Sequence, residues 1–296
     1  MYYQKLLEEL TSEQHDTISL LTKIINPFAL YFMCNHYIGT ELTDNSIPKP
    51  EGVNNILETN IMDLKDYDIV HIQNNYLPEF IRHLLPNLDK KIILTTGQFL
   101  LPQIYISEIS EILLHNPYIV AWVSQNPIYS YHSKYLAFPY GIFAERLVEY
   151  SHALRANTKA KHKHITHLFC SPTNESRLKL PPRDSINPCD FYSEIMNSRF
   201  VISPIGDRDD CYRHYECIGL GAIPISNVST HYKQLFKNNM YYCDVDEMLQ
   251  IIESDKVPYD YVMPNRDFIC FDYHKDRLLK IQREFRNPAN TAMKEY

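Results

Sequence analysis

Short apolar runs of strand length recur along the chain, and stretches with the mixed pattern of a helix lie between them. The apolar runs are 28–33, 69–72, 91–96, 119–123, 166–170, 200–203 and 223–226. The helix-like stretches are 78–85, 107–115, 191–197, 210–219, 245–253 and 273–285. Most of the runs are continuous rather than alternating, which is typical of strands buried on both faces of a parallel sheet. The alternation of strand and helix therefore predicts an α/β fold.

Chain length and a polar stretch near mid-chain predict two domains. A chain of 296 residues is long enough to form two medium-sized cores. The basic run KAKHKH, at 159–164, follows a polar stretch at the position where a linker would fall. We expect an N-terminal lobe at 1–155 and a C-terminal lobe at 156–296, with the last helix crossing back to the first lobe.

Composition and charge exclude several classes of protein. The net charge of −7 argues against sequence-independent nucleic-acid binding, which needs a surplus of Lys and Arg. The seven cysteines are scattered without a C-x-x-C pair, so they suggest neither a disulfide framework nor a zinc site. No run reaches the roughly 20 apolar residues that span a bilayer, and the N-terminus lacks the pattern of a secretory signal. We expect a soluble, cytoplasmic protein without a membrane span.

Glycines are scarce, seven in all, and five of them stand at candidate ligand sites. Gly97 and Gly141 each follow an apolar run, while Gly206, Gly219 and Gly221 lie close together. Ligands of open α/β sheets bind beyond the carboxyl ends of the strands, where turns need positive φ or a close backbone approach. For Gly141 and Gly219, an ordinary turn explains the glycine equally well.

The segment 197–226 has the pattern of one βαβ unit: a strand, a Pro-x-Gly turn, a helix with a polar start and a second strand. Steps of 100° per residue along the helix 210–219 separate apolar from charged side chains. The face expected to pack on the sheet consists of Cys211, Tyr215 and Ile218. The charged face consists of Asp209, Arg213 and Glu216. This charged face begins at a helix N-terminus, whose N–H groups and partial positive charge favour an anion.

The charged face suits a nucleotide-sugar. Arg213 can hold phosphate oxygens through two parallel hydrogen bonds, and Glu216 can accept hydrogen bonds from sugar hydroxyls. The alternative for this pair is a surface ion pair that contributes only about 0.2–0.5 kcal/mol. The position of the pair between Pro204-Ile205-Gly206 and Gly221-Ala222-Ile223-Pro224 favours the nucleotide-sugar.

This segment resembles the exostosin-like glycosyltransferases. The matching residues are Ser198-x-Phe200, Pro204-x-Gly206, Arg213-x-x-Glu216 and Gly221-Ala222-Ile223-Pro224-Ile225. The resemblance implies a GT-B fold, in which two Rossmann-like lobes with parallel sheets face each other across a cleft. It also implies inverting transfer from a UDP-sugar to a glycan or glycoprotein, with no cofactor and no obligatory metal. Arg213 and Glu216 would then be donor ligands.

The resemblance also assigns roles to the two lobes, with the acceptor on 1–155 and the donor on 156–296. Soluble members, such as the xylosyltransferases of large algal viruses that act in the host cytoplasm, fit a chain without an export signal, so xylose is a candidate sugar. Further donor-binding candidates are Thr173, Arg177, Ser203, Pro204, Gly206, Asp209 and Gly221. For Thr173 and Arg177, a polar surface turn is an equally good interpretation.

Catalysis would need stabilisation of the leaving group and a general base. Arg213 and the helix N-terminus are expected to stabilise the departing diphosphate. Candidates for the base that takes the acceptor proton are His71 in an apolar strand, Asp44 in a loop and Glu79 at a helix start. A core histidine and ordinary loop carboxylates are the stronger interpretations, so the base stays open.

Three other functions are compatible with the sequence, one of which is an unrelated α/β nucleotide-binding protein. Asp207-Arg208-Asp209 matches the Asp-x-Asp metal site of metal-dependent glycosyltransferases, although Pro204-Ile205-Gly206 separates it from the strand end. The chain also fits a non-catalytic carbohydrate- or nucleotide-binding module that keeps the same fold.

Overall fold

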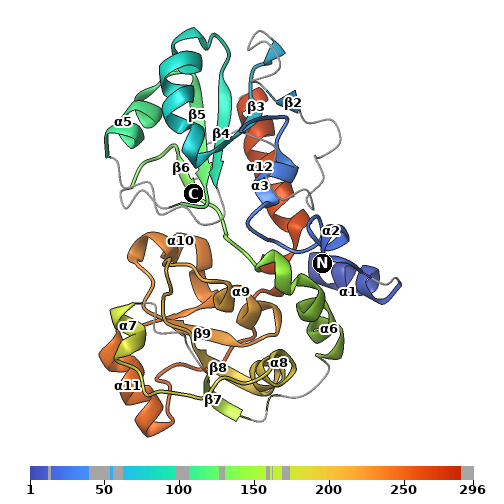
Figure 1. The fold of residues 1–296 in the computed structure, drawn as a ribbon, viewed down its shortest axis with the longest axis vertical. Helices are drawn as coiled ribbons and strands as arrows, with labels where there is room; N and C mark the ends of the chain where they lie inside the picture. The colour runs from blue at the N-terminus through green and yellow to red at the C-terminus, as the bar shows by residue number, and fades with distance from the viewer. Residues whose placement is uncertain are drawn as a thin grey trace. The chain divides into compact units, whose positions relative to one another are not determined.

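Two compact α/β units, each with its own parallel sheet, make up the chain (Figure 1). The computed structural model describes residues 1–12, 15–39, 54–55, 63–97, 107–126, 131–157, 161, 163–168 and 174–287. Unit 1 comprises Met1–Asn26 and Pro139–Tyr273, and unit 2 comprises Pro27–Phe138 and His274–Tyr296. The α/β class predicted from the alternating pattern is confirmed.

Both units are discontinuous in sequence, and the expected division at residue 155 lies inside unit 1. Helix α1 (Tyr2–Ser12) contacts α6 (Leu147–Ala156). The Ile25 N–H also donates a hydrogen bond of 2.8 Å to Ile269 O. These contacts join the first residues and α6 to the C-terminal half of the chain. Helix α12 (Phe271–Arg286) begins in unit 1 and continues into unit 2.

The sheet of unit 2 is parallel throughout, with the strand order β2-β1-β3-β4-β5-β6. Its strands are β1 (His36–Ile38), β2 (Asn54–Asn55), β3 (Asp68–Gln73), β4 (Ile92–Gly97), β5 (Ile119–Ser124) and β6 (Tyr135–Ala137). From β1 the order runs to β2 on one side and to β3, β4, β5 and β6 on the other. The sheet therefore has a topological switch point between β1 and β3, where ligands of such sheets commonly bind.

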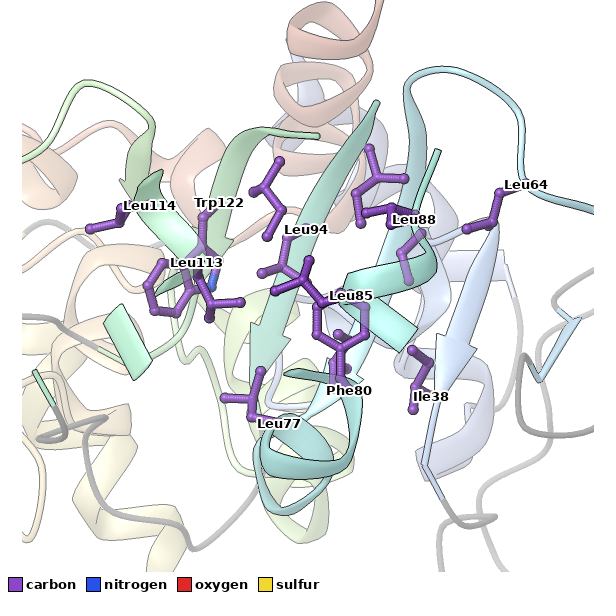
Figure 2. Close-up of a cluster of buried hydrophobic side chains, with 14 residues drawn as sticks. Ile38, Leu64, Leu77, Phe80, Leu85, Leu88, Leu94, Leu113, Leu114 and Trp122 are labelled. Carbon is purple, nitrogen blue, oxygen red and sulfur yellow. The ribbon is translucent and has the colours of Figure 1, made fainter. Parts of the chain in front are cut away.

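One hydrophobic cluster of unit 2 lies on one face of this sheet (Figure 2). Val70, Leu94 and Trp122 pack there against the segment made of α4 (Leu77–Glu79), the π-helical η3 (Phe80–Leu84) and η4 (Leu85–Asn87), and against α5 (Ser107–His115). The short helix α3 (Ala29–Met33) contacts β3 and β4, and its Tyr31 ring lies 6.5 Å from the ring of His71. Because side chains alternate along a strand, His71 and α3 belong to the opposite face.

The sheet of unit 1 is also parallel, with the order β10-β9-β8-β7. Its strands are β7 (Lys163–His167), β8 (Ser198–Ile202), β9 (Ile223–Ser226) and β10 (Tyr241–Tyr242). Its remaining helices and short helical turns are α2 (Thr17–Leu20), η5 (Ala144–Arg146), α7 (Glu175–Leu178), α8 (Pro188–Asn197), α9 (Tyr212–Gly219), η6 (Thr230–Tyr232), α10 (Lys233–Phe236), η7 (Lys237–Asn239), α11 (Val245–Ser254) and η8 (Arg266–Ile269). Met248 and Ile251 of α11 pack with Phe200 and Ile225, whereas α8 and α9 lie on the other side of the sheet (Figure 1).

Most predicted elements are confirmed, and three differ. The strand expected at 166–170 is β7 (Lys163–His167), so only 166–167 coincide, and 169–170 lie outside the described residues. The run 28–33 was expected to be a strand, but residues 29–33 form α3, because a short continuous apolar run is compatible with either structure. The stretch 78–85 forms successive α, π and 3-10 turns instead of one regular helix. Pro86 lacks the N–H that would continue an α-helical ladder, which accounts for the change at the end of this stretch.

Candidate functional site

The candidate site lies in unit 1, where β8 and β9 end. β8 ends at Ile202 and is followed by the loop 203–210, and α9 then begins after its N-cap Cys211. The Ser203 N–H still donates to Ile225 O at 2.9 Å, so the loop leaves the sheet beside the end of β9. The carboxyl ends of parallel strands are the usual ligand-binding edge of such a sheet.

Three side chains hold the turn Pro204–Gly206 by its backbone. Asn174, the N-cap of α7, donates through Nδ2 to Ile205 O at 2.9 Å and to Gly206 O at 2.6 Å. Arg177 donates through Nε to Ile205 O at 2.8 Å. Asn227, which follows β9, accepts the Ile205 N–H at 3.1 Å. The turn is thereby fixed from α7 on one side and from β9 on the other.

Gly206 leaves room for the close approach of Arg177. A Cβ atom at residue 206 would lie 2.7 Å from Nη2 of Arg177, which is below van der Waals contact. Arg177 and Gly206 were both predicted to bind the donor, and these two residues lie together. Arg177 therefore holds its positive charge beside the turn that follows β8.

The start of α9 is fixed by a reciprocal cap between Cys211 and His214. The Cys211 side chain accepts from the His214 backbone N–H, and the Cys211 N–H donates to His214 Nδ1 at 3.3 Å. His214 Nε2 lies 2.9 Å from Ser203 O and 3.0 Å from Ser226 Oγ. One buried imidazole therefore joins the ends of β8 and β9 to the first turn of the helix.

Asp210 connects the start of α9 to the segment that enters unit 1 at Pro139. Its buried carboxylate accepts hydrogen bonds from the Tyr215 hydroxyl at 2.7 Å and from the Tyr140 N–H at 3.0 Å. Burial raises the pKa of Asp210, although Arg208 and both hydrogen bonds oppose the shift. Arg208 Nε lies 3.9 Å from this carboxylate, and its guanidinium lies 4.1 Å from the centre of the Tyr140 ring. Arg208, in the loop after β8, is thus a third arginine near the start of α9, besides Arg177 and Arg213.

The two faces predicted for α9 are confirmed in part. Cys211, Tyr215 and Ile218 are buried, as expected for the face on the sheet. Glu216 was expected on a charged outer face, yet only 1% of it is exposed. Its carboxylate accepts from the Tyr192 hydroxyl of α8 at 3.0 Å and lies 3.8 Å from Arg146 Nη1. The helical period could not show this, because the covering groups come from α8 and from η5.

The other two residues of the predicted charged face are partly exposed. The guanidinium of Arg213 lies 5.2 Å from the centre of the Phe191 ring. Asp209 accepts the Ser229 N–H at 3.3 Å, so this carboxylate turns toward the segment after β9. The charged face is therefore reduced to Arg213, with the two acidic residues engaged by neighbouring groups.

Arginine side chains act on two titratable groups near this edge. Burial alone would raise the pKa of the Cys211 thiol, but His214, Arg177 and Arg213 lower it. At the end of β7, burial and the nearby Arg183 and Arg213 lower the pKa of His167 to about 4. Arg213 thus acts on two groups, one at the N-cap of α9 and one at the end of β7. Such an edge favours an anionic ligand.

The remaining donor candidates divide into two groups. Ser203 and Pro204 are buried in the turn, and Ser203 Oγ has no hydrogen-bond partner among the residues that the structure describes. Gly221, in contrast, has a φ of +75° and lies just before β9 begins. The amino end of a parallel strand is opposite the edge that carries Gly206. The assignment of Gly221 to the donor site is therefore corrected: this glycine ends α9. Thr173 lies outside the described residues.

The candidates for a catalytic base gain no support. His71 lies inside β3, is buried, and has Nδ1 3.0 Å from Thr95 Oγ1. Burial lowers its pKa to about 3, so the imidazole is neutral near pH 7. This is the environment of a core histidine. Glu79 is exposed at the end of α4, and Asp44 lies outside the described residues.

Several residues of the site were not identified in the sequence. Asn174 had a usable signal, because an Asn before a helical stretch is a preferred N-cap. Tyr192 and Arg146 had none, since their partner Glu216 is distant in sequence, and Cys211-x-x-His214 is not one of the usual capping-box pairs. Of the alternative metal pair, Asp207 and Asp209, Asp209 accepts the Ser229 N–H, and no group of three or more His, Cys, Asp or Glu able to hold a metal occurs in the described part of the chain.

Comparison with known proteins assigns no relative. No protein-family model matches the sequence, and no curated protein matches it. Within the ranges that the structure describes, no helix has both the length and the apolar character that a membrane crossing requires.

Proposed function

We propose that this protein is an inverting glycosyltransferase of the GT-B type, which transfers a sugar from a UDP-sugar to a hydroxyl of a glycan. The donor diphosphate binds at the carboxyl edge of the unit 1 sheet, beside the turn Pro204–Gly206. Xylose is the first sugar to test. The presence of two separate parallel α/β units supports the GT-B assignment, and it is compatible with other two-domain nucleotide-binding folds.

One observation carries the proposal: arginines from different elements gather at one sheet edge. Arg177 comes from α7, Arg208 from the loop after β8 and Arg213 from the first turn of α9. A nucleoside diphosphate brings two to three negative charges, which guanidinium groups bind through paired hydrogen bonds. The N-terminal end of α9 adds partial positive charge at the same place.

Glu216 has a positioning role in this proposal. Its buried carboxylate lies 3.8 Å from Arg146, whose side chain is 46% exposed. In this role the buried carboxylate orients the guanidinium of Arg146 by its charge. The carboxylate is itself held by the hydrogen bond from the Tyr192 hydroxyl. This role replaces direct contact of Glu216 with a sugar hydroxyl.

The proposed transfer step needs these arginines and a general base. The acceptor hydroxyl oxygen attacks the anomeric carbon, the bond from that carbon to the diphosphate oxygen breaks, and the hydroxyl proton passes to a base that we do not assign. Arg177 and Arg213 stabilise the negative charge that develops on the departing UDP.

A UDP-release assay tests this function. Each UDP-sugar is incubated with the protein and a panel of glycan acceptors, with and without a chelator. Acceptor-dependent release of UDP that persists with the chelator is the expected result. Loss of release with the chelator would favour the Asp-x-Asp mechanism. Donor binding without turnover for any sugar would identify a non-catalytic module, and the proposed activity would be wrong.

A further inference from the structure

An open groove of about 350 Å³ lies beside α11, and none of the residues assigned to the donor site lines it. Its lining comes from the helix and from the segment that follows the helix: Asp244, Asp246, Glu247, Gln250, Ile251, Ser254, Lys256 and Pro258. All of these residues except Glu247 and Ile251 are exposed. The groove is therefore accessible to a ligand from solution.

The groove forms because the chain turns back at the end of α11. Asp255, the C-cap, has the left-handed conformation, with a φ of +52°. Val257 then packs against the same hydrophobic cluster as Ile251 of the helix. Two residues further on, the ring of Tyr259 lies 5.8 Å from the ring of Tyr241. The returning segment thus forms one wall of the groove, and α11 forms the other.

The two ends of the groove carry opposite charges. Asp244, Asp246 and Glu247 belong to the N-cap and first turn of α11, whereas Lys256 follows its C-cap. The rise of the helix from Glu247 to Ser254 is about 10 Å, which is beyond the reach of an ion pair. In the described part of the chain, no hydrogen bond or ion pair joins the side chain of Asp246 or Lys256 to another group. Both charges are thus available to a bound molecule.

The groove between the charged ends has the mixed chemistry that a peptide needs. The amide of Gln250 can donate and accept hydrogen bonds, as a peptide backbone does, and Ile251 and Pro258 supply apolar surface. The carboxylate of Glu247 is held in place, because it accepts a hydrogen bond of 2.6 Å from the Tyr241 hydroxyl. Acidic residues at the start of a helix also stabilise the helix dipole. The groove and the unpaired lysine at its other end are what indicate a ligand.

We infer that this groove binds a peptide segment of a partner protein, in which a basic and an acidic side chain stand about 10 Å apart. The basic side chain pairs with the carboxylates at the start of α11, and the acidic side chain pairs with Lys256. Charge complementarity selects this occupant, because a wholly basic segment would be repelled by Lys256 and a wholly acidic one by the three carboxylates. The inference does not depend on the proposed glycosyltransferase activity.

Short capped peptides with a fixed spacing between their charges are suitable probes. A polyproline II helix has three residues per turn and a rise of about 3.1 Å per residue. The peptide Lys-Pro-Pro-Glu therefore holds its two charged side chains on one side, about 9 Å apart. This peptide, labelled with a neutral fluorophore, is titrated with the full-length protein at low ionic strength, and fluorescence anisotropy is measured. We expect saturable binding that weakens as salt is added.

Variants at the two ends of the groove assign the contacts. Asp246→Asn and Lys256→Ala should each weaken the binding of Lys-Pro-Pro-Glu by roughly three- to fivefold, the effect of losing one exposed ion pair. Glu253→Gln is the matched control, because Glu253 is an exposed acidic residue of α11 that does not line the groove. Its affinity should equal that of the wild type. Lys256→Glu should reverse the preference, so that Lys-Pro-Pro-Lys binds more tightly than Lys-Pro-Pro-Glu.

Three results would overturn the inference. The first is that Lys-Pro-Pro-Glu does not bind the wild-type protein. The second is that Asp246→Asn, Lys256→Ala and Glu253→Gln all bind it with equal affinity, with unchanged melting temperatures showing that the variants are folded. The third is that the wild type binds Lys-Pro-Pro-Lys as tightly as Lys-Pro-Pro-Glu, which would show only that an acidic surface attracts cations. None of these results bears on the binding of UDP, so each proposal can fail while the other stands.

Discussion

The guanidinium of Arg177 lies against Gly206, so that a Cβ atom at residue 206 would be 2.7 Å from Nη2. The same side chain donates through Nε to Ile205 O. Arg177 and the turn after β8 therefore form one packed unit, although α7 precedes β8 in the chain. In the proposed donor site, binding of the diphosphate would therefore depend on both residues.

Gly206→Ala should destabilise the protein through its collision with Arg177. Gly206 is not among the glycines with positive φ, so the cost is steric, and it should be modest, roughly 1 kcal/mol or less, because the colliding atom is the end of a long side chain. The cost should fall substantially in an Arg177→Ala background, where the colliding group is absent. Urea unfolding of the wild type, both single variants and the double variant measures this coupling. An equal cost in the two backgrounds would show that the contact is unimportant.

The stability of the Glu216→Gln variant relative to the wild type should increase as the pH rises. Burial raises the pKa of Glu216 above 4.5, against the opposing effects of Arg146, Arg213 and Tyr192. The folded protein therefore holds this proton where the unfolded chain loses it, and stability falls as the pH rises from 4.5 through the raised pKa. Glutamine does not titrate, so the variant does not undergo this decrease in stability. Its free energy of unfolding relative to wild type should increase between pH 4 and pH 8, and a constant difference would contradict the argument.

His71 should make the protein less stable in acid. Its folded pKa of about 3 lies below the ordinary 6.5 because the ring is buried. Below pH 6.5 the unfolded chain binds a proton that the folded protein does not, so stability falls by up to about 1.4 kcal/mol per pH unit. His71→Gln should show a shallower slope between pH 6.5 and pH 4. His83→Gln, at an exposed position, should keep the wild-type slope; identical slopes in both variants would refute the assignment.

The sequence was a good guide where one periodic pattern decides the structure. The strands at 69–72, 119–123 and 223–226 were predictable because continuous apolar runs fit a sheet covered on both sides. It could not show that residues 1–26 fold with the C-terminal half, since that depends on contacts such as Ile25 with Ile269. The prediction of a strand at 28–33 was wrong, because the apolar pattern of this run has no period that distinguishes a strand from a helix.

The candidate site was predictable to a similar degree. Gly206 and Arg213 were placed by the strand, turn and helix pattern of one segment. The burial of Glu216 was not, because Tyr192 and Arg146 approach it from other elements. Gly221 was grouped with Gly206 because the two are near in sequence, whereas the helix between them carries the chain to the opposite end of the sheet.

His214→Ala should destabilise the protein and disturb the strand ends together. The imidazole is the common partner of Ser203 O and Ser226 Oγ, and it accepts the Cys211 N–H. Its loss leaves these buried groups unpaired, which should lower the free energy of unfolding by roughly 2–4 kcal/mol. His214→Gln can restore one of these hydrogen bonds and should recover part of the loss in urea unfolding. No recovery together with a small initial loss would exclude the bridging role.

Calorimetric titration with UDP tests the central claim most directly. The proposed donor site predicts that UDP binds the wild-type protein and that Arg213→Ala and Arg177→Ala each weaken binding by about tenfold or more, since each removes a charged hydrogen-bond donor. Arg199→Ala is the matched control, because Arg199 is an exposed arginine on β8 that lies 6.0 Å from the Tyr261 ring. Its affinity for UDP should equal that of the wild type. No binding of UDP to the wild type, or equal affinity in all folded variants, would contradict the assignment of the donor site.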